Sequence, residues 1–201
     1  MKKLLLVIVL IFSVNCTQRA VVREEQPQFY KVSGRQYPHN ISVVFSEDFL
    51  LLGEEIDPEQ ERFVVSSSYE INIGKPLSTS LTGGADLIYN KVTVIDNANR
   101  ASADDRIIRF SQGTGEFDVE QDARTLSVTR IYYTLNILFE LIDHNNNVIK
   151  SEPVSGKGIY NAGLSIHETK DQFSVAINAS IFIVTEIVAN LLAKGFAEPG
   201  S

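Results

Sequence analysis

The residue with the most distinctive chemistry is Cys16, the only cysteine in this chain of 201 residues. Its thiol stands at the end of a segment with the order of an export signal. A short basic start, residues 1–3, is followed by an unbroken apolar run, residues 4–12, and polar residues begin at Thr17. That run is too short for a bilayer core, which takes about 20 residues to cross. The sequence therefore predicts a secretion signal whose cleavage box ends in a cysteine.

This order resembles the lipobox of bacterial lipoproteins. In that family the cysteine thiol is diacylated, the preceding peptide is removed, and the new N-terminus is usually acylated. The resemblance implies a signal peptide over residues 1–15 and lipidation at Cys16. The commonest box has Leu at −3 and Gly or Ala at −1, where this chain has Ser13 and Asn15. The alternatives are an uncleaved anchor helix and a plain signal with a chance cysteine.

The residue after the cysteine bears on location. In enteric bacteria, an Asp there tends to retain lipoproteins in the inner membrane. This chain has Thr17, which favours the outer membrane, with the domain facing the periplasm. The inner membrane and the cell surface are the alternatives.

The chain offers little for a metal ion or a cofactor. Asp143, Asn145 and Asn147 open like a calcium-binding loop, but Val148 replaces the turn glycine and Val154 replaces the bidentate glutamate. We therefore interpret residues 143–147 as a hairpin turn, since Asn and Asp tolerate positive φ. The histidines lack the short spacing of a zinc site; they are His39, His144 and His167. We expect no metal and no cofactor.

Motifs of catalysis are also missing from the sequence. The glycines near 83–84 and 113–115 do not fit the phosphate-loop pattern, and we assign them to helix packing and to a break in a strand. No G-x-S-x-G nucleophile elbow occurs. We expect a binding protein rather than an enzyme. The alternative is an envelope hydrolase whose Ser, His and Asp residues meet only in the fold, which a His within hydrogen-bond reach of a Ser or Asp would indicate.

The acidic net charge of the chain disfavours some classes of binding partner. Removing residues 1–15 takes away Lys2 and Lys3, which leaves 16 basic against 25 acidic residues and a formal charge of −9. An acidic surface repels nucleic acid and anionic headgroups, so we expect no nucleic-acid partner. Attachment to a membrane must then come from acyl chains on Cys16, several of which hold firmly where one alone binds marginally.

Periodicity predicts a tether over residues 16–40 and a single α+β domain over 41–201. Strands are expected where β-branched and aromatic residues alternate, and helices where apolar residues recur every three or four positions. The predicted strands cover residues 41–45, 62–73, 91–95, 106–120, 127–142 and 148–160, and the predicted helices cover 76–89 and 167–194. This order predicts a two-layer sandwich, in which two helices cover one face of an antiparallel or mixed sheet of four to six strands.

The order of these elements resembles small periplasmic lipoproteins of Gram-negative bacteria. The similarity spans residues 60–194 and includes "YEINIG", "KVTVI", "YYTLNILFELID" and "VSGKGIY". The families that this layout resembles include the lipopolysaccharide-assembly lipoprotein family and lipoprotein subunits of lipid-transport systems. The resemblance implies a binding or scaffold component of an envelope assembly or transport complex, and it assigns no functional residue.

Two apolar stretches are candidates for an interaction surface. The C-terminal helix is apolar around most of its circumference, so we expect it to be buried on more than one side. Phe182, Ile183 and Ile187 widen its apolar face, and we expect them to contact a protein partner, a second copy or a lipid. Leu50 and Leu51 belong to three adjacent leucines that cannot all face one core, so at least one is a candidate for exposure.

Overall fold

The structure is a computed structural model that describes residues 18–21, 36–56, 69–121, 128–165 and 170–198. Its main element is a five-stranded mixed sheet, in which β2 is parallel to both of its neighbours and β6, β7 and β8 are antiparallel. The order across this sheet is β5 (Tyr89–Ile95), β2 (Tyr37–Phe45), β6 (Arg106–Gln121), β7 (Val128–Ile142) and β8 (Val148–Ser165).

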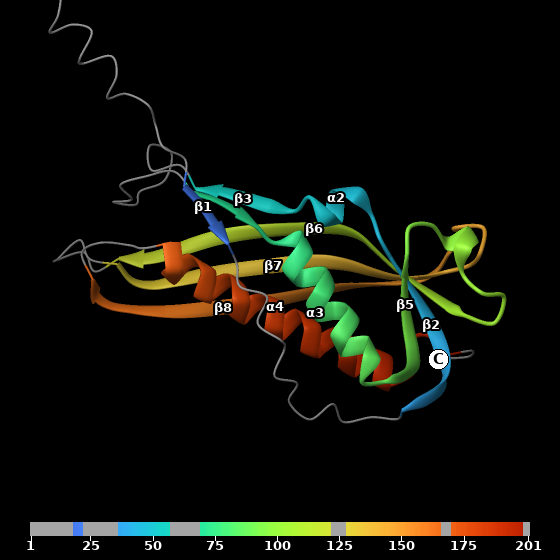
Figure 1. The fold of residues 1–201 in the computed structure, drawn as a ribbon. Coiled ribbons are helices and arrows are strands. Elements are labelled where there is room, and N and C mark those ends of the chain that lie inside the picture. The colour runs from blue at the N-terminus through green and yellow to red at the C-terminus, as the bar shows by residue number, and fades with distance from the viewer. Residues whose placement is uncertain (1–17, 22–35, 57–68, 122–127, 166–169, 199–201) are drawn as a thin grey trace, which may run out of the picture.

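A second, three-stranded sheet and two long helices lie on one face of the large sheet (Figure 1). The small sheet has the order β1 (Gln18–Val21), β4 (Tyr69–Asn72) and β3 (Gly53–Ile56). The helices are α2 (Glu47–Leu50), α3 (Gly74–Asp86), the 3₁₀ turn η1 (Ala98–Arg100) and α4 (Lys170–Ala193). The predicted α+β sandwich with two helices over a mixed sheet is therefore confirmed, and the small sheet is an addition to it.

Several boundaries differ from the predicted ones. Strand β2 begins at Tyr37 rather than at 41, and β1 lies within the stretch predicted as a tether. The acidic stretch after β2 is compatible by sequence with a loop or a short helix, and it forms α2 and then β3. Cys16 and residues 62–68 of the predicted second strand lie outside the described residues.

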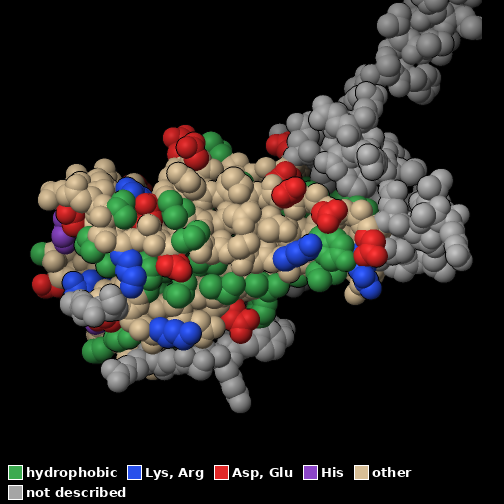
Figure 2. All heavy atoms as spheres, turned by 180° about the vertical axis from the view of Figure 1, so that it is seen from behind, with side chains coloured by type: hydrophobic (Ala, Val, Ile, Leu, Met, Phe, Trp, Pro, Cys, Tyr) green, Lys and Arg blue, Asp and Glu red, His purple; other side chains and the backbone are tan. Residues whose placement is uncertain are grey.

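Strand β7 shows how one face of the sheet forms the main core. Its alternating apolar residues are buried against the helices and the small sheet; they are Ile131, Tyr133, Leu135, Ile137 and Phe139. The alternation along this strand predicts that Ile137 and Phe139 share the buried face, and both are buried. Because side chains alternate along a strand, the intervening residues belong to the opposite face. That opposite face shows scattered charged side chains (Figure 2), and Asn136 and Ser155 are exposed neighbours on it. At one end it is covered, because Val44, Ile107 and Ile142 are buried beside Ala98.

Strand β6 runs without interruption through Gly113 and Gly115, where a break was predicted. The predicted break was wrong because Gly115 does not form a turn; its lack of a side chain leaves space for a side chain of the neighbouring strand. A Cβ on Gly115 would collide with the Tyr133 hydroxyl, which donates a hydrogen bond of 3.2 Å to Glu54 Oε1 on β3. Burial, together with the charge of Glu54 and this hydrogen bond, raises the pKa of the Tyr133 hydroxyl. This contact ties the small sheet to the large one.

Helix α4 is buried on two sides, as its apolar circumference predicted. It packs on β7 and β8 on one side and on α3 on another, and the Thr185 hydroxyl donates a buried hydrogen bond of 2.9 Å to Ser80 of α3. By length and composition alone, residues Gln172–Ala193 also meet the criteria for a membrane span. The contacts within the chain make α4 the core helix of this domain. It ends at Ala193, and Gly195, two residues further on, has a φ of 92°, which favours glycine.

The turn between β7 and β8 confirms the hairpin interpretation of residues 143–147. The Asp143 carboxylate accepts hydrogen bonds of 2.8 Å from the Asn145 and Asn147 backbone N–H groups and from the Asn147 side-chain amide. These bonds, the Asn147 side-chain bond first among them, lower the pKa of Asp143. Asn146 adopts a φ of 65°, the left-handed conformation that this residue type tolerates.

A largely buried ion pair joins β6 to β7 on the face of the sheet opposite the main core, in addition to the exposed pair Arg130–Glu120. Arg109 Nε donates a hydrogen bond of 2.8 Å to Glu140 Oε2, and Glu140 is buried. Burial acts to raise the pKa of Glu140, but hydrogen bonds from Arg109 and Ser111 and the charge of Arg109 outweigh it, so the pKa lies below its ordinary value. The folded state therefore favours the ionised carboxylate.

We expect the Glu140→Gln substitution to remove a pH-dependent part of the stability. A carboxyl with a depressed pKa in the folded state stabilises above its unfolded pKa, and this stabilisation is lost as the pH falls through the folded pKa. At pH 7 the substitution should cost about 1–3 kcal/mol, because a hydrogen bond to a charged group is lost. Urea unfolding at pH 7, 5 and 3 measures this, and the difference between wild type and variant should shrink as the pH falls. Parallel curves would contradict the assignment.

Candidate binding cleft

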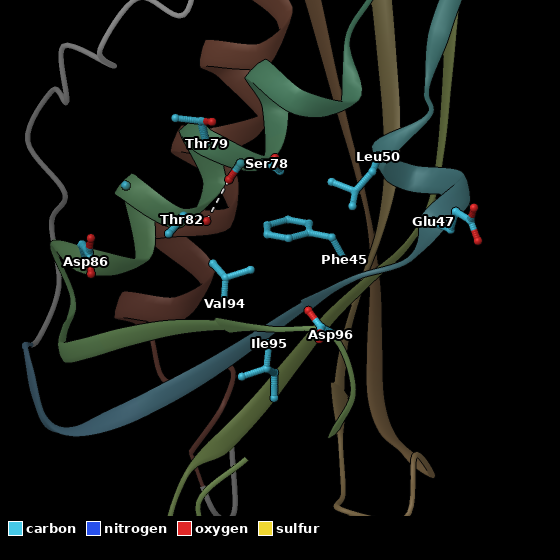
Figure 3. A pocket seen from close by; sticks show the side chains of 11 residues that line it. Phe45, Glu47, Leu50, Ser78, Thr79, Thr82, Asp86, Val94, Ile95 and Asp96 are labelled. Carbon is cyan, nitrogen blue, oxygen red and sulfur yellow. Dashed lines mark hydrogen bonds between the residues drawn. The ribbon is translucent and has the colours of Figure 1, made fainter. Parts of the chain in front are cut away.

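A cleft of about 940 Å³ opens between α2, α3 and the end of β5 (Figure 3). This volume lies in the range of sites that bind small molecules or side chains of a partner. Its described lining residues are Phe45, Glu47, Leu50, Ser78, Thr79, Thr82, Gly83, Asp86, Val94, Ile95 and Asp96. The floor is apolar, one wall carries hydroxyl groups, and the rim is acidic.

The apolar floor includes Val94 of β5, which α3 leaves exposed. Val94 is paired with Val43, so the two side chains share one face of the sheet. Val43 is buried in the core, whereas Val94 is 55% exposed. In Figure 3 the rings and methyl groups of Phe45, Val94 and Leu50 point toward the same space.

Helix α2 presents Leu50 to the cleft from the other side. Ser46 caps this helix: its Oγ accepts a hydrogen bond of 3.2 Å from the Phe49 backbone N–H and donates one of 2.9 Å to the Ser111 carbonyl. The Phe49 ring is fully buried and stacks on Phe45 with centroids 5.5 Å apart. With Phe49 fixed inward, the next residue, Leu50, faces outward and is 40% exposed.

The wall formed by α3 follows from its amphipathic pattern. Leu77, Leu81 and Ala85 are buried, which leaves Ser78, Thr79 and Thr82 on the side toward the cleft. Their hydroxyls donate to carbonyls one turn back: Ser78 and Thr79 to Lys75, at 2.9 and 3.1 Å, and Thr82 to Ser78, at 2.8 Å. Because the hydroxyl protons of these three residues already bond to helix carbonyls, their oxygens can only accept hydrogen bonds from a ligand in the cleft.

The rim of the cleft is negative. Glu47, Asp86 and Asp96 line it, and no lysine or arginine belongs to the lining that the structure describes. Arg100 pairs with Asp96, with an Nη1–Oδ2 distance of 2.6 Å. Glu47 and Asp86 are exposed, and neither has an ion-pair partner within the described part of the chain. A hydrophobic floor with an acceptor-rich, acidic border is suited to an apolar ligand that carries positive charge.

The residues predicted for an interaction surface fall in two separate places. Leu50 lines the cleft, and Leu51, which is also exposed, lies next to it outside the lining. Phe182, Ile183 and Ile187 are half-buried on α4 and do not belong to the cleft. Ile187 packs against the core, and the Ile183 side chain lies over Gly156 of β8. The sequence did not indicate Phe45 or Val94 as site residues, because both continue the ordinary apolar alternation of their strands and only the packing of α2 and α3 around them forms the cleft.

The histidines lie apart from the cleft. His39 Nε2 lies 2.9 Å from Glu198 Oε1, and its ring packs against Tyr37 and Tyr89, which also stack on each other. His144 borders a second hollow of about 840 Å³ with Asp104 and Asp105. Neither of these two histidines hydrogen-bonds to a serine in the described residues, and His167 lies outside them. Among the side chains that the structure places, no group of three or more His, Cys, Asp or Glu could hold a metal ion.

Comparison with known proteins shows a fold but no family. No family profile matches the sequence, and no curated protein matches it. Among solved structures, a minor lipoprotein from Acinetobacter baumannii matches with a TM-score of 0.50 and 11% identity, over 83% of this chain and 98% of that one. An uncharacterized lipoprotein B from Nitrosomonas europaea (TM-score 0.49, 10% identity, 83% and 91% coverage) and the rare lipoprotein B from Shewanella oneidensis (0.45, 12%, 79% and 94%) are also similar. The chain therefore shares the fold of a bacterial lipoprotein.

Proposed function

We propose that this chain is a lipid-anchored envelope protein that binds a protein partner as a component of an assembly or transport complex. The lipid anchor is inferred from the position of Cys16, which follows a basic start and an apolar run. The fold shared with the Acinetobacter protein, which is called a minor lipoprotein, supports it. With Thr17 after the cysteine, the proposed location is the outer membrane, with the domain in the periplasm.

The binding role is supported by the cleft. A monomeric protein rarely leaves contiguous apolar side chains open to water without a use for them. Leu50 and Val94 are open across a hollow with a shaped, polar border. Scattered exposed hydrophobic residues are ordinary on proteins, but two of them facing one cleft from different elements form a surface. This surface fits a ligand-binding role better than a purely structural one.

Substitution of Cys16 tests the anchor. Cells expressing wild-type chain or the Cys16→Ala variant are labelled with a fatty-acid probe, and the chain is recovered and fractionated between membrane and soluble material. We expect the wild type to carry label and to sediment with the outer membrane. The variant should carry none and should appear as an unprocessed or soluble form, because acylation needs the thiol. Absence of label on the wild-type chain would overturn the proposal.

A further inference from the structure

We propose that the cleft between α2, α3 and β5 binds a short segment of a partner protein in which apolar side chains alternate with lysine or arginine. This inference rests on the proposed binding role and specifies the partner's chemistry; it does not depend on the lipid anchor. The apolar side chains would contact Phe45, Leu50 and Val94, which face one another across the cleft (Figure 3). The basic side chains would reach the rim.

The charges around the cleft favour a bound segment that carries positive charge. Glu47 and Asp86 stand on opposite sides of the cleft, one on α2 and one at the end of α3. The hydroxyl oxygens of α3 between them accept and do not donate toward the cleft, since their protons are bonded to helix carbonyls. Ammonium and guanidinium groups are donors only, so they satisfy both features. An anionic group would be repelled by the carboxylates and would find no donor among these hydroxyls.

The same charges favour a protein segment over an envelope lipid. Anionic phospholipid headgroups are repelled by an acidic border, as the whole surface of the chain repels them. A polypeptide has a further contact available. Strand β5 is an edge strand: β2 pairs with one side of it, and no other strand of the described residues pairs with the second side. Edge strands are sites where an extended segment of a partner adds to a sheet.

Two synthetic heptapeptides test the inference against the full-length chain in detergent. In one, lysine alternates with valine; in the other, glutamate alternates with valine. Fluorescence anisotropy should show binding of the lysine peptide and none of the glutamate peptide. The Glu47→Gln/Asp86→Asn double variant should bind the lysine peptide about tenfold more weakly, because each exposed ion pair contributes modestly. The matched control, Glu116→Gln/Asp118→Asn, removes two exposed carboxylates from β6 and should bind like the wild type.

A second pair of variants tests the apolar floor. Val94→Arg places a cation in the cleft and should abolish binding of the lysine peptide. Val148→Arg makes the same change at a valine of similar exposure, 48% against 55%, at the start of β8 and should leave binding unchanged. Equal melting temperatures of the two variants would show that both are folded.

Three outcomes would overturn the inference. They are no binding of the lysine peptide to the wild type, equal weakening by both double variants, and binding of phosphatidylglycerol vesicles that Val94→Arg strengthens, which would assign the cleft to a lipid. Fatty-acid labelling of Cys16 is unaffected by any of these results. Failure of the peptide inference can therefore be told apart from failure of the anchor.

Discussion

Replacing Phe139 by alanine should destabilise the domain by about 3–5 kcal/mol, the usual cost of removing a fully buried phenylalanine. The Phe139 side chain has no exposed surface. Its ring stacks on Phe110 of β6 with centroids 5.5 Å apart and on Phe196, beyond the end of α4, at 4.2 Å. The substitution removes contacts to a strand and to the C-terminal segment at once, so the cavity has little freedom to collapse. Urea unfolding measures the loss.

Asn146 provides the control within the same hairpin. Asn146→Ala should cost about 1 kcal/mol, because alanine is disfavoured at a positive φ. Asn146→Gly should cost less still, since glycine adopts this conformation freely. If Asn146→Ala destabilised the domain more than Phe139→Ala, the burial of the β7 face described above would be wrong.

The parts of the fold that could be predicted from the sequence are those with local signals. The alternation along β7 and the Asn-rich turn predicted the long hairpin, and the predicted end of the last helix, at residue 194, lies next to its observed end at Ala193. Helix α3 was predicted from its apolar spacing, with its start two residues late. In each case the residues that decide the structure are neighbours in the chain, so propensity and period are sufficient.

The parts that could not be predicted depend on partners far apart in the chain. Strands β1 and β3 are four residues long, too short for a clear period. Strand β4 lies within the predicted strand over residues 62–73, but its pairing with β1, Gln18 with Tyr69, joins segments about fifty positions apart. Gly115 was interpreted as a strand break. The structure shows that a glycine is needed there to leave room for the Tyr133 hydroxyl, which belongs to another strand. The cleft also depends on distant segments: Val94 alternates normally in β5, and the facing wall is formed by α2, which lies much earlier in the chain.

A valine at position 158 should destabilise the contact between α4 and the sheet by about 3 kcal/mol, the upper end of the usual cost of overpacking. A Cβ on Gly158 would lie 2.5 Å from the Ser180 backbone nitrogen and closer still to the Ala176 carbonyl oxygen. Both atoms are helix backbone, which cannot rotate away as a side chain could, so α4 as a whole has to move.

The effect should be localised to the helix. Hydrogen exchange of the Gly158→Val variant should show faster exchange of α4 amides, while the β6–β7 ladder keeps its protection under conditions where the domain stays folded. Ser155→Val is the control: it adds a β-branched side chain to the same strand at an exposed position and should change stability by no more than about 0.5 kcal/mol. If Gly158→Val matched this control in stability and in α4 exchange, α4 would not lie as close to β8 as described. The wide apolar surface of α4 would then need a partner other than this sheet.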